Sequence, residues 1–134
     1  MGFEIKDIST GLRGWLAHVI QPTGPTIGKY HVNLTDLDII GTGAILDAIR
    51  NADILAIDEI GPMELFSKAF GKALIKAVES RKPIVGTIHY RLSNSLVNGI
   101  RNREDTEIIK VKYDNRENLH NLIVDKTSQY IQSL

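Results

Sequence analysis

The feature that most constrains the fold of this chain is the stretch ILAIDEIGPMEL, which covers residues 54–65. Its apolar start is too short to span a membrane but suits a strand buried on both faces, as in a parallel sheet covered by helices. Two adjacent carboxylates, Asp58 and Glu59, then lie at the C-terminal end of that strand, where open α/β sheets bind their ligands. A Gly-Pro pair follows and opens a helical pattern at Pro62.

Apolar periodicity predicts alternating strands and helices around this stretch, which is typical of an α/β fold with a mostly parallel sheet and helices on both faces. No linker divides the chain, so residues 1–134 are expected to form a single domain. The first half of the chain is expected to form an antiparallel hairpin (3–8 and 13–20), a loop (21–29), an extended piece (30–32), and one helix or two short ones after a cap at Asn33 or Thr35. The buried strand (53–57) follows, then a helix from Pro62 whose core side includes Phe66 and Phe70, a second buried strand (83–88), a short helix (93–101) and a strand (107–111). The last helix is expected to be capped by Asn115, and its inward-facing residues are Leu119, Leu122, Ile123, Ile131 and Tyr130.

Composition excludes several classes of site. Sixteen basic residues balance sixteen acidic ones, which gives no support for broad binding to nucleic acid or to an anionic membrane. The absence of cysteine excludes disulfides and thiolate chemistry, and the four histidines lack the spacing of a zinc site. The N-terminus has no apolar signal core, so a cytoplasmic location is the expectation.

The carboxylate pair has two interpretations. An apolar strand followed by Asp-Glu is the pattern of a Walker B motif, in which the aspartate helps to hold Mg²⁺ near the phosphates and the glutamate can orient or deprotonate the attacking water. The alternative is that Asp58 and Glu59 only complement the dipole of the helix that follows. The pattern alone favours this second, plainer interpretation.

A family resemblance changes that balance. The run IDEIGPMELFSKAF, the GTIH segment at 86–89 and the DNREN segment at 114–118, together with FEIKDISTGLRGWLAH and GPTIGKYHVNL upstream, resemble the P-loop nucleoside-triphosphatases of the THEP type along nearly the whole chain. The resemblance implies a P-loop body of the RecA/ASCE kind that hydrolyses the terminal phosphate of ATP or GTP with Mg²⁺. It also implies that Asp58 is the magnesium-associated aspartate and Glu59 the water-activating residue.

The sequence departs from the family at the phosphate-binding loop. The expected first strand, G-x-x-x-x-G-K-[ST] loop and first helix have no counterpart among these residues. The nearest segment, Gly24 to Tyr30, fails because Thr23 stands where the first glycine is needed and Tyr30 replaces the magnesium-binding hydroxyl. Lys29 is therefore expected to be an ordinary loop lysine. We expect the isolated chain to bind and hydrolyse nucleotide poorly, because this loop supplies most of the phosphate contacts.

Other polar residues could contact nucleotide. Thr87 and His89 end the second buried strand, where the related ATPases place a residue that senses the γ-phosphate; an ordinary strand-end hydrogen bond is about as good an explanation. Arg91 is a candidate for charge stabilisation, and Asn115 and Arg116 in the DNREN segment are candidates for nucleotide binding. Most surface arginines have no such role. The aromatics Trp15 and Tyr30 could stack on a base, but covering the hairpin is the more common role.

Three functions stay open at this point. The first is a nucleoside-triphosphatase, and the second is a kinase that passes the same phosphate to a small molecule. The third is a non-catalytic protein that keeps the fold for interaction. A missing strand would leave an edge open, and open edges promote association, so we expect a homo-oligomer or a partner that supplies the strand.

Overall fold

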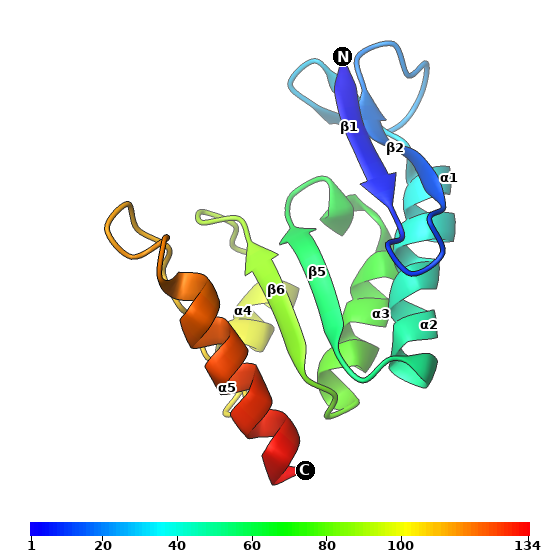
Figure 1. The fold of residues 1–134 in the computed structure, drawn as a ribbon. Helices are drawn as coiled ribbons and strands as arrows, with labels where there is room; N and C mark the ends of the chain where they lie inside the picture. Colours follow the sequence, from blue (N-terminus) through cyan, green and yellow to red (C-terminus); the bar gives the residue numbers. More distant parts are fainter.

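The strands belong to two separate sheets. In the computed structural model, which describes residues 1–134, strands β1 (Gly2–Lys6), β2 (Arg13–His18), β4 (Tyr30–Val32) and β3 (Thr26–Ile27) form an antiparallel sheet in that order. Strands β5 (Leu55–Ile60) and β6 (Ile84–Ile88) form a second, parallel sheet (Figure 1). The α/β class is confirmed, whereas the parallel sheet is smaller than the sequence predicts.

The N-terminal hairpin is confirmed. Strands β1 and β2 pair in antiparallel register from Gly2 opposite His18 to Lys6 opposite Arg13. The predicted loop at 21–29 is wrong in part, because Thr26–Ile27 pairs with Tyr30–His31. Gly28, with φ +57°, lies in the tight turn between them, in a conformation that glycine adopts without cost.

One continuous helical run follows the hairpin, so the alternative of two short helices is wrong. It comprises α1 (Leu34–Asp36), a π-helical segment η1 (Leu37–Thr42) and α2 (Gly43–Asn51). The Asn33 side chain accepts a hydrogen bond from the Asp36 amide and caps its start. A Cβ atom at Gly41 would lie 3.1 Å from Ile5 Cδ1, so this glycine lets the hairpin approach the helix closely.

The helix after the carboxylates begins later than Pro62. Residues Glu64–Phe66 form a short 3₁₀ turn (η2), and α3 (Lys68–Glu79) starts after Ser67, whose side chain accepts a hydrogen bond from the Phe70 amide. Phe70 is buried as predicted, but Phe66 is 43% exposed, so its prediction as a core residue is wrong. A cap at Ser67 places Phe66 before the helix, outside its apolar stripe.

Only one face of the parallel sheet is closely packed. Leu55 and Ile60 of β5 share a core with Leu74 of α3 and with Val97 and Ile100 of α4 (Ser95–Arg101). On the opposite face, Ala56 and Thr87 are exposed, so the prediction of strands buried on both faces is wrong. Helices cover one face, and the other stays accessible.

The C-terminal part differs most from the prediction. Residues 107–111 form no strand and pair with none, so β6 pairs with β5 alone. The last helix, α5 (Leu119–Ser133), begins after Asn118 instead of Asn115. Among the residues predicted to face inward, Leu119 is buried and Ile123 half-buried, while Leu122, Tyr130 and Ile131 are exposed. Figure 1 shows α5 beside the parallel sheet, and Tyr130 Oη donates a hydrogen bond to the Arg81 carbonyl at 2.8 Å. None of the helices combines the length and the apolar character that a membrane crossing needs.

Candidate functional site

The carboxyl ends of β5 and β6 bring Asp58 and Thr87 together. The two strands run in parallel, so their polar ends meet at one edge of the sheet. Thr87 Oγ1 donates a hydrogen bond of 2.7 Å to Asp58 Oδ1. Both side chains are exposed, so the second carboxylate oxygen remains accessible to a ligand. The structure thus joins two residues that the sequence places 29 positions apart.

The strand pairing is irregular at this point. Ile57 is opposite Gly86, and Ile60 is opposite Ile88, so the register shifts across the two carboxylates. The Asp58–Glu59 peptide bond lies within the shift and is cis. Beyond the shift, the His89 amide donates to the Ile60 carbonyl at 3.2 Å, so backbone pairing continues up to the strand end. Asp58 and Glu59 are therefore held by paired backbone on both sides.

Glu59 has a second acidic neighbour that the sequence analysis missed. A Cβ atom at Gly61 would lie 3.1 Å from Glu59 Oε1 and 3.1 Å from Glu64 Oε2, so the two carboxylates flank this glycine. Glu64 is buried, with 8% of its surface exposed, and its Oε2 accepts a hydrogen bond of 3.0 Å from the Gly61 amide. The signal in the sequence was an acidic residue between Met63 and Leu65, three positions after a turn glycine.

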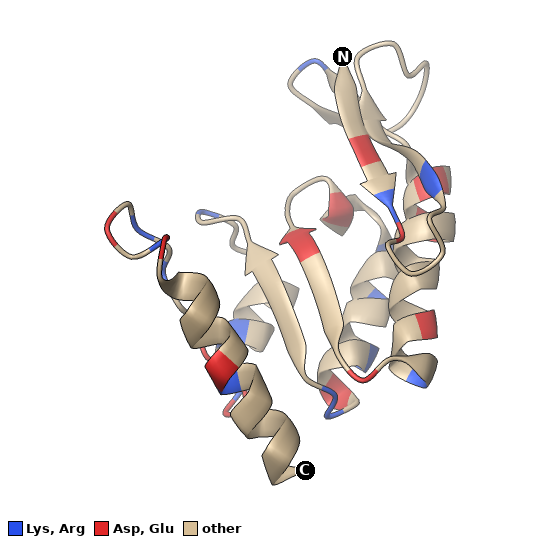
Figure 2. Ribbon diagram, viewed as in Figure 1, with Lys and Arg blue, Asp and Glu red and all other residues tan.

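Burial raises the pKa of the Glu64 carboxyl above its ordinary value of 4.5. Hydrogen bonds from the backbone amides of Glu64 and Gly61 lower this pKa in part, because they favour the charged form. The negative charge of Glu59 adds to the increase. Figure 2 shows acidic residues at the carboxyl end of β5 and in the segment that follows it. The two glutamates thus form a concentration of negative charge next to Asp58.

His89 and Arg91 follow β6 and lie at the same edge of the sheet. Both are exposed, and the Arg91 amide donates to His89 Nδ1 at 3.4 Å. The Arg91 guanidinium makes no hydrogen bond or ion pair within the chain, which leaves it available to an anion. Neither side chain makes a hydrogen bond or an ion pair with Asp58 or Glu59.

Asn115 and Arg116 lie in a separate turn. Asn115 Oδ1 accepts from the Lys112 amide at 2.8 Å, and its Nδ2 donates to the Lys110 carbonyl at 2.9 Å, so this side chain holds its own loop together. The Arg116 guanidinium lies 4.5 Å from the ring centroid of Tyr113. Neither residue makes a hydrogen bond or an ion pair with the carboxylate pair. The contacts of these two predicted residues are with their own turn.

The aromatic residues around the predicted loop pack on the hairpin. The rings of Phe3 and Tyr30 lie 5.0 Å apart, and the Trp15 ring meets His18 edge-on at 4.8 Å. Lys29 Nζ lies 5.6 Å from the centroid of Tyr30. These contacts agree with a covering role for the aromatics.

The donors at the strand end fit magnesium that arrives with a nucleotide. Mg²⁺ prefers oxygen ligands and usually binds through one or two carboxylates, waters and substrate phosphates. Asp58 offers an exposed carboxylate oxygen, and no group of three or more His, Cys, Asp or Glu residues could hold a metal ion by itself. The site therefore suits a metal that the substrate helps to bind.

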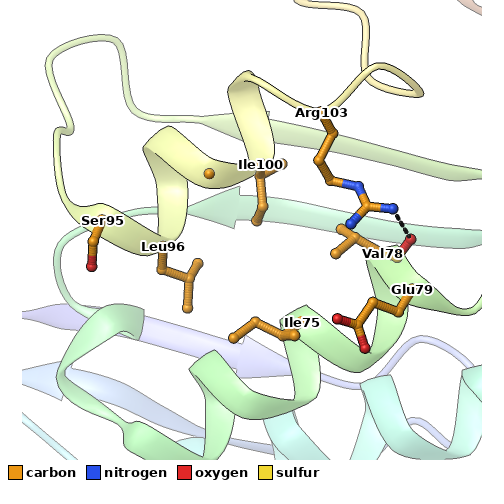
Figure 3. A pocket seen from close by; sticks show the side chains of 8 residues that line it. Ile75, Val78, Glu79, Ser95, Leu96, Ile100 and Arg103 are labelled. Carbon is orange, nitrogen blue, oxygen red and sulfur yellow. Dashed lines mark hydrogen bonds between the residues drawn. The ribbon is translucent and has the colours of Figure 1, made fainter.

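A partly apolar groove lies elsewhere, between α3 and α4. It has a volume of about 280 Å³, and side chains of both helices line it (Figure 3). Arg103 lies at one end, where its Nη2 donates to the Val78 carbonyl at 3.2 Å. None of the lining residues belongs to the carboxylate pair or to its neighbours.

Comparison with known proteins gives consistent results. Residues 1–124 match the sequence model of a family described as NTPase. The chain is 45% identical over 118 residues to the nucleoside-triphosphatase THEP1 of Thermofilum pendens, an alignment that covers 87% of this chain and 65% of that protein. It is 42% identical to the THEP1 of Methanosarcina acetivorans over 125 residues, or 93% of this chain and 69% of the relative. The crystal structure of THEP1 from Aquifex aeolicus superposes with a TM-score of 0.82 at 27% identity, covering 96% of this chain and 76% of the other. The chain thus spans about two thirds of the length of the curated relatives that it matches.

Proposed function

Because the chain belongs to the family of THEP1-type nucleoside-triphosphatases, we propose that it forms the metal- and water-handling part of a site that hydrolyses the terminal phosphate of ATP or GTP. The observation that carries this proposal is the hydrogen bond from Thr87 to Asp58, with Glu59 as the next residue along the strand. Phosphoryl transfer depends mostly on positioning and on charge stabilisation. Groups fixed at the end of paired strands meet that requirement.

Each residue has a distinct role in this proposal. Asp58, oriented by Thr87, would hold Mg²⁺, which neutralises charge on the phosphate oxygens when it is bound. Glu59 orients the attacking water and accepts its proton. Arg91 has a free guanidinium at the same edge and can clamp phosphate oxygens. His89 and Thr87 are placed to respond to the terminal phosphate, whereas support for Asn115 and Arg116 rests on sequence resemblance alone.

These 134 residues contain no G-x-x-x-x-G-K-[ST] sequence, so we propose that the phosphate-binding loop is supplied by other residues. Such a loop supplies backbone N–H donors, a lysine and one magnesium ligand. We therefore expect the isolated 134-residue polypeptide to bind and hydrolyse nucleotide weakly. Any longer polypeptide from the same gene that carries the loop should be much more active.

The test is Mg²⁺-dependent phosphate release from ATP and GTP, with isothermal calorimetry for binding. It compares the 134-residue polypeptide with a version extended at its N-terminus by the residues that the preceding roughly 30 to 50 codons encode. A strand, a loop and a helix need about that length. Release by the extended polypeptide that Asp58→Asn abolishes would support the proposal. Micromolar binding of Mg-ATP by the 134 residues alone would contradict the expected weakness.

A kinase would use the same residues, since only the acceptor of the phosphate differs. The exposed strand end leaves room for water or for a small acceptor. Phosphate release measured with and without added nucleoside and sugar acceptors separates the two activities. Transfer that exceeds release to water would favour the kinase. A cytoplasmic location remains a prediction for either activity.

A second candidate function is assembly through the parallel sheet. This candidate is favoured by the outer edge of β6, which pairs with no strand of the chain. An unpaired edge exposes backbone donors and acceptors that another strand can satisfy. We expect a dimer or a larger oligomer, or a partner chain that supplies the strand. Light scattering across a concentration series tests this expectation, and a monomer at high concentration would contradict self-association.

A further inference from the structure

We propose that Glu64 is a positioning residue for the Glu59 carboxylate and acts through the turn at Gly61. The inference rests on the proposed hydrolysis and adds to it a residue that does not touch the substrate. Glu64 lies in η2, on the segment that leaves the end of β5, and its carboxylate turns back toward that strand.

The first observation is that burial and hydrogen bonds fix the Glu64 side chain in this turn. Its side chain is buried, and Oε2 accepts a 3.0 Å hydrogen bond from the Gly61 amide. The Gly61 carbonyl in turn accepts a hydrogen bond of 3.3 Å from the Leu65 amide. Both backbone polar groups of Gly61 are thereby held by the 64–65 segment. A buried carboxylate is rare unless hydrogen bonds compensate its lost hydration, so this contact has a defined structural purpose.

The second observation is the position of Glu59 across the same glycine. Carboxylate oxygens of Glu59 and Glu64 would each lie 3.1 Å from a Cβ atom at Gly61. Glu64 is buried and fills its place beside Gly61, so its volume and like charge keep the exposed Glu59 carboxylate from moving inward. Asp58, the residue before Glu59, is exposed as well, so a nucleotide and its attacking water can approach both carboxylates from solvent. Glu64 therefore limits the positions that the Glu59 carboxylate can take.

The test compares two substitutions of Glu64 with a matched control. Glu64→Gln keeps the volume and a carbonyl oxygen that can accept the Gly61 N–H, whereas Glu64→Leu keeps the volume and removes the acceptor. Glu104→Leu is the control, because Glu104 is exposed and makes no side-chain hydrogen bond or ion pair. Amide exchange at Gly61 is measured by NMR on the 134-residue polypeptide. Values of kcat and KM are measured on the polypeptide that the function test identifies as active.

We expect slow Gly61 exchange in the wild type and in Glu64→Gln, and faster exchange in Glu64→Leu. We also expect Glu64→Leu to lower kcat by about 10- to 100-fold with KM unchanged, because small misplacements of a reacting group have effects of that size. Glu64→Gln should stay within about threefold of the wild type, since it restores the acceptor. In a Glu59→Gln background, Glu64→Leu should lower kcat no further, because the two residues act as a unit.

Three results would overturn the inference. They are unchanged Gly61 exchange in Glu64→Leu, equal losses in kcat for the Leu and Gln variants, and a full additional loss in the Glu59→Gln background. If no polypeptide hydrolyses nucleotide, the proposed function fails. The exchange at Gly61 then decides by itself whether Glu64 holds the turn.

Discussion

Thr87 Oγ1 lies 2.7 Å from Asp58 Oδ1, so a hydroxyl on one parallel strand donates a hydrogen bond to a carboxylate on its neighbour. Thr87→Val keeps the shape of the side chain and removes the donor. A hydrogen bond to a charged group contributes about 1.5–3 kcal/mol. We therefore expect Mg²⁺-dependent hydrolysis to fall about 10- to 100-fold if the bond acts mainly in the transition state. Thr87→Ser keeps the hydroxyl and is the matched control. Equal activity of the Val and Ser variants would show that Asp58 does not depend on this donor.

Substitutions of the two neighbouring carboxylates, Asp58 and Glu59, should have different effects on hydrolysis. Glu59→Gln removes the proposed general base, and we expect kcat to fall by about 10²- to 10⁴-fold while nucleotide affinity changes little. Asp58→Asn should instead weaken binding of Mg-nucleotide and raise the Mg²⁺ concentration needed for half-maximal activity. Phosphate release and calorimetry over a range of Mg²⁺ concentrations distinguish the two effects. A Glu59→Gln variant that retains wild-type kcat would remove Glu59 from the mechanism.

The raised pKa of Glu64 gives a pH dependence of stability with a defined sign. Burial raises this pKa in the folded state above its ordinary value of 4.5, so the folded protein binds the proton more tightly than the unfolded chain does. The stabilising effect of that proton is fully present below the ordinary pKa and is lost as the pH rises through the folded-state pKa. Glu64→Gln has no such proton to lose. The free energy of unfolding of this variant minus that of the wild type should therefore increase from pH 4 to pH 7.

Denaturant unfolding of both proteins at several pH values checks this dependence, because every other titrating group is common to the two. Glu59 is the acidic neighbour that contributes to the shift. A difference in unfolding free energy that stays constant across the pH range would mean that Glu64 has the same pKa in the folded and unfolded states.

Ser67 anchors the helix that supports the site. Its Oγ accepts a 3.0 Å hydrogen bond from the Phe70 amide and donates to Asp38, which joins α3 to η1. Ser67→Ala should lower the free energy of unfolding by about 0.5–2 kcal/mol, the usual cost of a lost helix cap. Ser128→Ala on the exposed side of α5 should change it by less than about 0.5 kcal/mol. Urea unfolding measures both, and equal values for the two variants would argue against the cap.

Local patterns predicted the hairpin, the position of β6 and a helix cap at Asn33 or Thr35, of which the structure has Asn33, because each depends on residues close together in the chain. The start of α3 was predicted too early, since Pro62 fits a first helical position as well as it fits the turn that it occupies. Residues 107–111 have the composition of a strand, but a strand also needs a second strand with which it pairs, and these residues pair with none. No local pattern contains that information.

The residues of the site were also predicted where a local sequence pattern marks them, and missed where only the folded chain brings them together. Asp58 and Glu59 stand out because an apolar strand leads into them, and the parallel strands bring Thr87 alongside. Glu64 was missed because its role depends on a side chain folding back onto the Gly61 amide. Asn115 was placed in the site by motif alone, whereas its amide bonds only to its own loop.

The division into two sheets has a consequence for engineering this protein. Hairpin and parallel sheet share no strand pair, and the hairpin reaches the rest of the molecule through the helical run 34–51, on which Asp36 Oδ2 accepts the Trp15 amide at 3.0 Å. The hairpin is thus attached through this helical run and through Ala17, which is buried in the core that it shares with the parallel sheet. Hairpins from related proteins should be interchangeable as long as the buried Ala17 and a glycine opposite Asp36 are kept, because a Cβ atom at Gly14 would lie 2.5 Å from that carboxylate.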